Sequence, residues 1–347
     1  MEEEHNEVDY STPVLVTGGT GLVGAYLLRY LVQQGYQNIR ALYRTGSDRS
    51  FTQSINPSID WIEGDVLDVI GLEEATQGVE QIYHSAAMIS FNHADRKEMM
   101  QVNIEGTANL INVALYNGVK RFLQVSSVAA IARTKPGQTL TETNQWERSS
   151  YNTQYGLSKY LAEQEAWRGY AEGLELVVVN PAIILGVHRW NSGPARFFPL
   201  LDNGFSFYPA GGSGFTDVRD VVTFMVKLME SHLNGERFIL NAQTLSYQSF
   251  FQKIATSIGA KIPKIPIAPA LQQLAWRLAW LQQKLTGKPS LITKETAAQS
   301  SRTYYYDGTK STEMLDFEYR DLDTTINEIG AFYKHKPHDS LQPFLPF

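Results

Sequence analysis

Tyr155 and Lys159 are the residues whose types and spacing point most directly to chemistry, and they lie in the stretch YGLSK at 155–159. Side chains four residues apart share one face of a helix, so a helical segment would make these two groups neighbours. An ammonium beside a phenol favours the phenolate and lowers the pKa of the hydroxyl. We therefore predict that Tyr155 transfers protons and that Lys159 assists it.

A glycine-rich turn, Thr17 to Gly24, follows an apolar, β-branched run. In a dinucleotide-binding turn, the first glycine allows a positive φ, the second lets the backbone approach a pyrophosphate, and the third packs the helix against the strand. The helix start also offers N–H groups to phosphates. Glycines cluster in ordinary turns too, but a position between a strand and an amphipathic helix predicts nucleotide binding. The expected contacts are Gly18, Thr20, Gly21, Leu22, Val23 and Gly24.

The second expected strand is followed by Arg44 and not by an acidic residue. A carboxylate at this place binds the ribose 2′-hydroxyl of NAD, whereas an arginine can pair with the 2′-phosphate of NADP. A solvated surface arginine is the alternative, and Arg49 offers a second cation nearby. We predict NADP as the cofactor, with NAD possible.

The alternation of short β-branched runs with longer helical segments predicts an α/β protein with a Rossmann-type, doubly wound parallel sheet and a smaller mixed α/β substrate domain. We expect a nucleotide domain at 12–185 plus 216–243, a substrate domain at 186–215 plus 244–335, and a disordered lead-in at 1–11. The expected strands are Val14–Thr17, Ile39–Tyr43, Ile59–Glu63, Gln81–His84, Phe122–Ser126 and Leu176–Val179, and the expected helices are Leu22–Gln34, Asp95–Asn117 and Thr153–Glu172.

Composition narrows the function classes. Thirty basic residues against 36 acidic ones, without a Lys/Arg-rich block, argue against nucleic acid as a partner. The absence of cysteine excludes disulfides and thiolate metal sites, and it fits a cytoplasmic protein, for which we predict no metal. The acidic start, Met1–His5, lacks the pattern of a signal peptide.

The stretch 265–285 is rich in Leu, Ala and Trp, but its prolines, glutamines and Arg277 make it too polar for a membrane span. Leucines recur there at helical spacing. We therefore expect an amphipathic helix near 268–285 packed on the body of the protein, with a helix lying on a bilayer surface as the alternative.

Taken in order along the chain, a series of short motifs resembles the extended short-chain dehydrogenases/reductases, the NAD-dependent epimerase/dehydratase family. The motifs are Thr17–Gly24, Gly64–Val66, His84–Ala87, Val102–Thr107, Val125–Ser127, Tyr155–Lys159, Asn180–Pro181 and Thr216–Val221. The likeness is closest to dihydroflavonol-reductase-like and 3β-hydroxysteroid-dehydrogenase-like members, whose late segments match Tyr305–Lys310 and Met314–Phe317.

The resemblance implies that Tyr155 protonates a carbonyl oxygen as hydride arrives, that Ser127 orients this oxygen, and that Lys159 holds the ribose. Ser126 is the fallback for Ser127, and a turn-capping hydroxyl is the alternative role. Asn103 matches an active-site asparagine of the family, although a helix residue that bonds backbone fits nearly as well. The other expected cofactor contacts are Asp65 and Val66 at the adenine, Ala86 and Ala87 along its path, and Pro181 and Ile184 beside the nicotinamide.

The expected pocket rim is apolar and aromatic, and its substrate contacts are Met88, Ser90, Phe91 and Trp190. Each aromatic ring could equally belong to the core. Such a rim favours an NADP(H)-dependent oxidoreductase that reduces a ketone or aldehyde of an apolar small molecule, or oxidises the alcohol.

Two other functions stay open. A nucleotide-sugar epimerase with tightly bound NAD is the first, and a non-catalytic nucleotide-sensing protein is the second. Dehydration is disfavoured because Val128 follows Ser127 where dehydratases of the family carry an acidic pair. Members of the family commonly pair through two helices of the nucleotide domain, so a homodimer is a candidate assembly.

Overall fold

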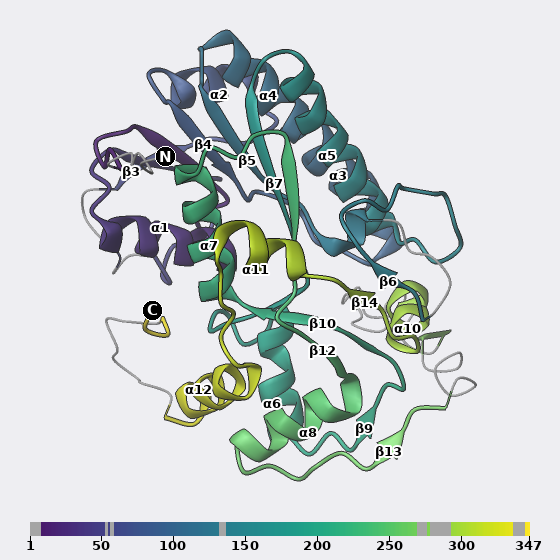
Figure 1. The fold of residues 1–347 in the computed structure, drawn as a ribbon. Helices are drawn as coiled ribbons and strands as arrows, with labels where there is room; N and C mark the ends of the chain where they lie inside the picture. The colour runs from purple at the N-terminus through teal and green to yellow at the C-terminus, as the bar shows by residue number, and fades with distance from the viewer. Residues whose placement is uncertain are drawn as a thin grey trace.

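A seven-stranded parallel sheet forms the centre of the molecule in the computed structural model, which describes residues 8–52, 55, 59–131, 137–268, 276–277, 293–335 and 344–347 (Figure 1). The strand order is β11-β7-β5-β4-β1-β2-β3. Chain order reverses between β1 and β4, and sheets of this kind bind ligands at the carboxyl ends of the strands there. The strands are β1 (Val14–Thr17), β2 (Ile39–Tyr43), β3 (Asp60–Glu63), β4 (Gln81–His84), β5 (Arg121–Val125), β7 (Glu175–Pro181) and β11 (Glu236–Leu240). The predicted Rossmann-type sheet is confirmed.

Helices cover both faces of this sheet (Figure 1). Val14 and Val16 pack with α1 (Leu22–Gln34) and α7 (Val218–Glu230) on one side, whereas Leu15 packs with the other helices on the opposite side. Those helices are α2 (Val69–Thr76), α4 (Gly106–Tyr116) and α5 (Gln154–Ala171). Apolar runs without polar alternation follow from burial on both faces.

The helix expected near Asp95–Asn117 is present as a helical run from Arg96 to Tyr116, with a π-helical turn inside it that the sequence did not predict. After the short helix η1 (His93–Asp95), the segment contains α3 (Arg96–Met100), a π-helical turn η2 (Gln101–Glu105) and then α4. A Cβ on Gly106 would lie 2.5 Å from a methyl carbon of Val66, so a glycine is needed where this helix passes the loop after β3. Wide turns of this type are frequent at functional sites.

The later part of the chain builds smaller sheets beside the central one. The sheet pairings are β12-β10-β8, β13-β9 and β14-β6. The elements are β6 (Thr139–Leu140), β8 (Ile183–Leu185), η4 (Pro194–Arg196), α6 (Phe197–Asp202), β9 (Phe207–Tyr208), β10 (Gly212–Asp217), β12 (Gln243–Ser246), α8 (Tyr247–Ser257), β13 (Ile265–Pro266), α10 (Lys294–Ser300), β14 (Tyr305–Tyr306), α11 (Thr309–Leu315) and α12 (Leu322–His335).

Three expectations concern the ends and the Leu-rich stretch. Residues 8–11 of the expected disordered lead-in are placed: Tyr10 packs edge-on against Tyr36 with 5.4 Å between ring centroids. Of the amphipathic helix expected near 268–285, only 268 and 276–277 lie within the described residues. None of the helices that the structure describes combines the length and the apolar character needed to cross a bilayer.

A buried ionic cluster ties α7 to α12. Asp217 caps α7, is fully buried, and pairs with the Arg219 guanidinium at 2.6 Å. Arg219 also pairs with Glu328 of α12, and Thr325 donates a hydrogen bond to Asp217. A buried carboxylate in this setting depends on its cation, because burial without a partner leaves its charge uncompensated.

We predict that Arg219→Ala lowers the free energy of unfolding by about 3–5 kcal/mol, because it leaves Asp217 buried without its cation. Lys334→Ala removes an ion pair with Asp202 in which both side chains are at least one-third exposed, and it should cost less than about 1 kcal/mol. Urea unfolding of the two variants makes the comparison. Equal losses would contradict the assignment of the buried pair as a main link between α7 and α12.

Candidate active site

The glycine turn between β1 and α1 is shaped by close backbone approaches. Gly18 has a φ of 73°, and a Cβ there would lie 2.7 Å from the backbone nitrogen of Ala86 after β4. A Cβ on Gly24 would lie 2.3 Å from the Gly18 carbonyl oxygen. The Gly21 N-cap supplies no side chain to the first turn of α1, whose N–H groups have no partner within the helix. The turn therefore fits an incoming phosphate.

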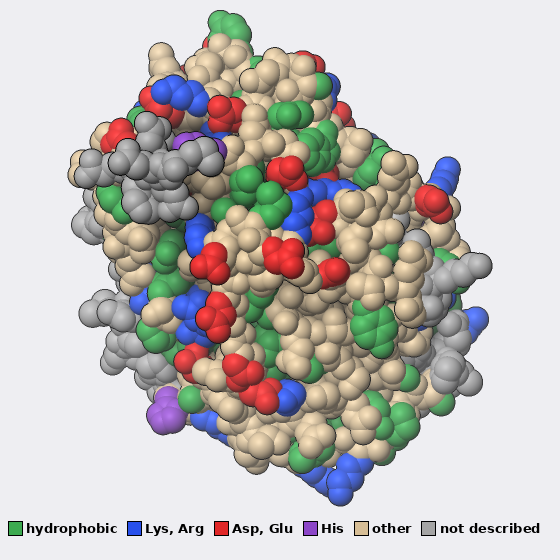
Figure 2. Space-filling view, viewed as in Figure 1, with side chains coloured by type: hydrophobic (Ala, Val, Ile, Leu, Met, Phe, Trp, Pro, Cys, Tyr) green, Lys and Arg blue, Asp and Glu red, His purple; other side chains and the backbone are tan. Residues whose placement is uncertain are grey.

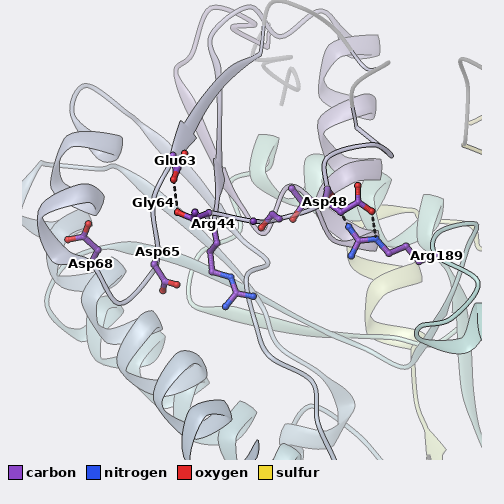
Figure 3. Close-up of a pocket in the computed structure, with 11 residues that line it drawn as sticks. Arg44, Asp48, Glu63, Gly64, Asp65, Asp68 and Arg189 are labelled. Carbon is purple, nitrogen blue, oxygen red and sulfur yellow. Dashed lines mark hydrogen bonds and ion pairs between the residues drawn. The ribbon is translucent and has the colours of Figure 1, made fainter. Parts of the chain in front are cut away.

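A pocket of about 740 Å³ adjoins this turn (Figure 3). Thr20 lines it from the glycine turn, Arg44 from the end of β2, and Asp65 and Asp68 from the loop after β3. Figure 3 shows the Arg44 side chain extending into the space beside Asp65. Within the described parts of the chain, the Arg44 guanidinium forms no salt bridge.

Arg49 is placed differently from Arg44. Its guanidinium carbon lies 4.3 Å from the centroid of the Tyr43 ring and 5.7 Å from that of Trp61. This cation–π stacking holds the Arg49 guanidinium against the aromatic side chains of β2 and β3. Arg44 is therefore the better-placed cation of the two for a ligand in the pocket.

An ion pair crosses the other end of the pocket. Arg189 Nε lies 3.3 Å from the Asp48 carboxylate, and Arg189 Nη2 donates to the Asp48 carbonyl at 2.7 Å (Figure 3). The pair joins the loop after β2 to the loop after β8. Both side chains line the pocket, although sequence reasoning assigned neither of them to the site.

The start of α5 is pressed against the segment that follows β5. Thr153 caps the helix by accepting from the Gly156 N–H at 2.9 Å. A Cβ on Gly156 would lie 2.7 Å from the Ala129 carbonyl oxygen, so a side chain here would push the helix away. Tyr155, next to this glycine, is thereby held beside the segment that begins at Ser127.

Lys159 is almost fully buried, and its Nζ donates to the Val125 carbonyl at 2.8 Å, where β5 ends. Burial lowers the pKa of Lys159 to about 8, and the Glu163 carboxylate one helical turn further on opposes this shift. The ammonium therefore stays the main form at neutral pH, where it can favour an ionised Tyr155.

Ser127 follows β5 as the N-cap of a short helix, η3 (Val128–Ala130), and its hydroxyl accepts from the Ala129 N–H at 3.1 Å. Its carbonyl accepts from the Asn180 side chain at 3.1 Å, and the same amide donates to Glu163 at 2.9 Å. The adjacent Ser126 is the more buried of the two serines. The turn-capping role left open for Ser127 is thus present, and it leaves the hydroxyl proton available to a substrate oxygen.

Asn103 lies in the π-helical turn and is almost fully buried. Its side chain accepts from the Met88 N–H at 2.7 Å and donates to the Met88 carbonyl at 3.0 Å. It also donates to the Ser158 hydroxyl at 2.9 Å, which in turn donates to the Tyr155 carbonyl at 2.8 Å. These bonds fit the alternative of a residue that holds backbone, here the backbone on both sides of the site.

His84 forms a second set of buried hydrogen bonds, next to the glycine turn. Its Nδ1 lies 2.7 Å from the Thr17 hydroxyl and its Nε2 lies 3.1 Å from the Thr107 hydroxyl. Because Thr107 donates its proton to the Asn103 carbonyl, it must accept from His84 Nε2, which assigns the proton to that nitrogen. Burial and the nearby Lys159 ammonium lower the pKa of His84 to about 3.

The predicted substrate contacts are only partly brought together. The ring centroid of Phe91 lies 5.7 Å from that of Tyr155, and Met88 is tied to Asn103. Ser90 donates to Asp95 at 2.7 Å. Trp190 instead packs against Phe198 and Tyr333, in the apolar cluster around α6 and α12. That aromatic ring is therefore at least partly core, the alternative that the sequence left open.

The other predicted cofactor contacts lie around the carboxyl edge of the sheet. Val66 is buried against α4, and Ala87 is exposed after β4. Pro181 ends β7 in the central sheet, and Ile184 lies in β8 of the three-stranded sheet. The sequence did not predict the hydrogen bonds that three further residues make around the site, namely Ser158, Asn180 and Glu163. Only the recurrence of Glu163 four residues after Lys159 could have indicated it.

Charges on the face shown in Figure 2 are mixed. Lys and Arg side chains alternate there with Asp and Glu side chains, and no continuous basic surface crosses this face. Among the described residues, no group of three or more His, Asp or Glu side chains is arranged to hold a metal ion.

Comparison with known proteins agrees with this geometry. The model of the NAD dependent epimerase/dehydratase family matches residues 14–241. The chain is 32% identical over 313 residues to a putative dihydroflavonol 4-reductase from Synechocystis sp., a match that covers 86% of this chain and 88% of that protein. The crystal structure of gox2253 has a TM-score of 0.80 at 27% identity and covers 95% of this chain and 100% of that chain. The NAD- and TYD-bound dTDP-glucose 4,6-dehydratase DesIV from Streptomyces venezuelae has a TM-score of 0.77 at 19% identity, which shows a common fold; 94% of this chain and 98% of that chain are covered.

We predict that the stability contributed by neutral His84 is fully present above pH 6.5 and is lost as the pH falls toward about 3, because the unfolded chain binds a proton that the fold rejects. Between pH 7 and pH 5 the loss should be about 2 kcal/mol larger for the wild type than for His84→Gln in urea unfolding. His188, whose pKa burial lowers to about 4, contributes equally to both proteins. Parallel pH dependences would contradict a buried neutral His84.

Proposed function

Because the chain belongs to the NAD dependent epimerase/dehydratase family, a family of NAD(P)-dependent enzymes, we propose that it is an NADP(H)-dependent oxidoreductase of the reductase type. It reduces a ketone or aldehyde of an apolar small molecule to the alcohol, or catalyses the reverse oxidation. The arrangement of Tyr155 and Lys159 on α5, beside Ser127 at the end of β5, is the observation that carries the proposal.

The residues present fit a nicotinamide dinucleotide. Gly18, Gly21 and the first turn of α1 would hold the pyrophosphate, and the pocket lined by Arg44 and Asp65 would take the adenosine end. When bound, this cofactor supplies the hydride for reduction or accepts it in oxidation. Arg44 would pair with a 2′-phosphate, which is the basis for proposing NADP rather than NAD.

Proton transfer falls to Tyr155. Its hydroxyl gives its proton to the substrate oxygen as that oxygen gains charge, and the resulting phenolate is then reprotonated from solvent. The Lys159 ammonium lowers the cost of the phenolate, and its bond to the Val125 carbonyl fixes its position. The Ser127 hydroxyl donates to the same substrate oxygen and orients it. In the oxidising direction, Tyr155 takes the proton from the alcohol.

An apolar substrate is supported by two observations. The Phe91 ring lies edge-on to Tyr155, so an aromatic surface borders the reacting group. The protein from Synechocystis sp. to which the chain is 32% identical is named a putative dihydroflavonol 4-reductase, and that name states the reduction of a dihydroflavonol. The substrate class we propose is therefore an aromatic or polycyclic carbonyl compound.

A nucleotide-sugar epimerase with bound NAD is the second candidate, favoured by the match to the NAD dependent epimerase/dehydratase family. Purification separates the two candidates. An epimerase would retain NAD and consume no NADPH over a full turnover, whereas the reductase should bind NADPH reversibly and oxidise it with a ketone or aldehyde.

We predict that Tyr155→Phe lowers kcat by roughly 10²- to 10⁴-fold, because the general acid is lost. Binding of NADPH, measured by its fluorescence, should change less than about twofold, since the ring is kept. Tyr160→Phe is the matched control on the same helix, where the Tyr160 ring stacks on Trp146 instead. A Tyr155→Phe enzyme with undiminished kcat would overturn the proposed mechanism.

We predict that Arg44→Ala raises the KM for NADPH by roughly 10- to 100-fold, because a charge-assisted bond to the 2′-phosphate is lost. The KM for NADH should stay nearly constant. Arg49→Ala is the matched control, since Arg49 stacks on Tyr43. If Arg49→Ala changed the preference between the cofactors and Arg44→Ala did not, Arg44 would not be the phosphate ligand.

A further inference from the structure

Residues 344–347, the sequence FLPF, dock against α1, which lies near the other end of the chain in sequence (Figure 1). Phe344 and Leu345 are only 6% and 3% exposed. The centroid of the Phe344 ring lies 5.0 Å from that of Tyr26, and the Phe347 ring lies 4.8 Å from Tyr30, both on α1. We call these four residues the docked segment.

Hydrogen bonds fix the backbone of the docked segment. The Tyr26 hydroxyl accepts from the Leu345 N–H at 3.2 Å, and Arg29 donates to the Leu345 carbonyl at 2.9 Å. Arg219, from the buried ionic cluster, donates to the Pro346 carbonyl at 2.8 Å. The Arg29 guanidinium also lies over both phenylalanine rings. This is a built docking site, with polar partners for successive backbone groups.

One ring of the docked segment also contacts the cofactor pocket's own loop. Phe344 lies 4.4 Å from Phe51 between ring centroids, and Phe51 lies 4.6 Å from the His188 ring. Phe51 lies in the same loop after β2, three residues beyond the stretch from Arg44 to Asp48 that lines the pocket. His188 precedes Arg189, the partner of Asp48 across the pocket. Phe344 therefore packs directly on the loop after β2, and it reaches the loop after β8 through the Phe51 ring.

The polar side chains of the loop from Arg44 to Phe51 are held by the Asp48–Arg189 pair and by the stacking of Arg49 on the Tyr43 ring. Several of its side chains are exposed, and its backbone bonds are local, such as Ser47 N–H to the Arg44 carbonyl and Thr52 N–H to the Arg49 carbonyl. Ordering such a loop costs conformational entropy unless contacts with other elements offset it. The Phe51 ring supplies an apolar contact of this kind, because it packs between Phe344 and His188 and beside Tyr26 of α1.

We propose that Phe344 is a positioning residue for cofactor binding: through Phe51 it holds the loop after β2 in the conformation that lines the pocket, and so it sets the affinity for the dinucleotide. The inference rests on the proposed function only in that the pocket takes the adenosine end of the cofactor. A ligand that binds one loop conformation loses apparent affinity in proportion to the fraction of molecules in that conformation.

Phe344→Ala and Phe347→Ala form a matched pair for the test. Both remove an aromatic ring of the same segment that packs on α1, but only Phe344 touches Phe51. The dissociation constants of NADPH and of NADH are measured for both variants, together with thermal unfolding, kcat at saturating cofactor, and hydrogen exchange of residues 44–52.

We expect Phe344→Ala to weaken binding of whichever cofactor the wild type prefers by roughly three- to tenfold, with kcat unchanged and faster exchange in 44–52. Phe347→Ala should leave the cofactor affinity and the hydrogen exchange of 44–52 within about twofold of wild type. This should hold even if it lowers the melting temperature as much as Phe344→Ala does. Equal effects of both variants on affinity would overturn the proposal, as would Phe344→Ala binding with wild-type affinity. Preference for NADH would count against the proposed NADP specificity alone, because the comparison between variants still holds with NADH.

Discussion

The buried position of the Lys159 ammonium is the constraint on which the site depends. An ammonium can be buried only with a polar partner, and here that partner is the Val125 carbonyl at the end of β5. This bond places the first two turns of α5 at the carboxyl edge of the central sheet. Gly156 permits the approach, since any Cβ would meet the Ala129 carbonyl. The phenol of Tyr155 and the hydroxyl of Ser127 lie at the same edge of the central sheet, because this bond and this close approach fix the start of α5 there.

Buried polar side chains next to the site connect α5 to the other elements around it. Asn103 ties the backbone at Met88 to Ser158 of α5, and Asn180 ties Ser127 to Glu163. His84 joins the strand that precedes the glycine turn to the helix that carries Asn103. Buried hydrogen bonds of this kind fix geometry, because each unpaired group would be costly. The proposed cofactor edge and the proposed proton donor therefore form one connected framework.

The sequence predicted the framework better than its surroundings. β1, β2, β4 and α1 have the predicted boundaries, because buried parallel strands and their glycine turns have strong local patterns. The π-helical turn at Asn103 was not predicted, and the hydrogen-bond partners of Asn103, Met88 and Ser158, lie 15 and 55 positions away in the sequence. Trp190 packs in an aromatic cluster that composition alone cannot distinguish from a pocket wall. Docking of 344–347 on α1 depends on side chains some 300 positions away, beyond the reach of any local pattern.

The last strand of the central sheet has a consequence for how the chain folds during synthesis. β11 pairs with β7, yet the segment between them, from Ala182 to Gly235, first builds β8, β9 and β10 of the smaller sheets. A nascent chain that has emerged from the ribosome only as far as Pro181 has therefore exposed β7 as an open edge, with no α7 to cover α1. Because unpaired edges promote aggregation, we expect nascent chains stalled before β11 to depend on chaperones more than chains released after it.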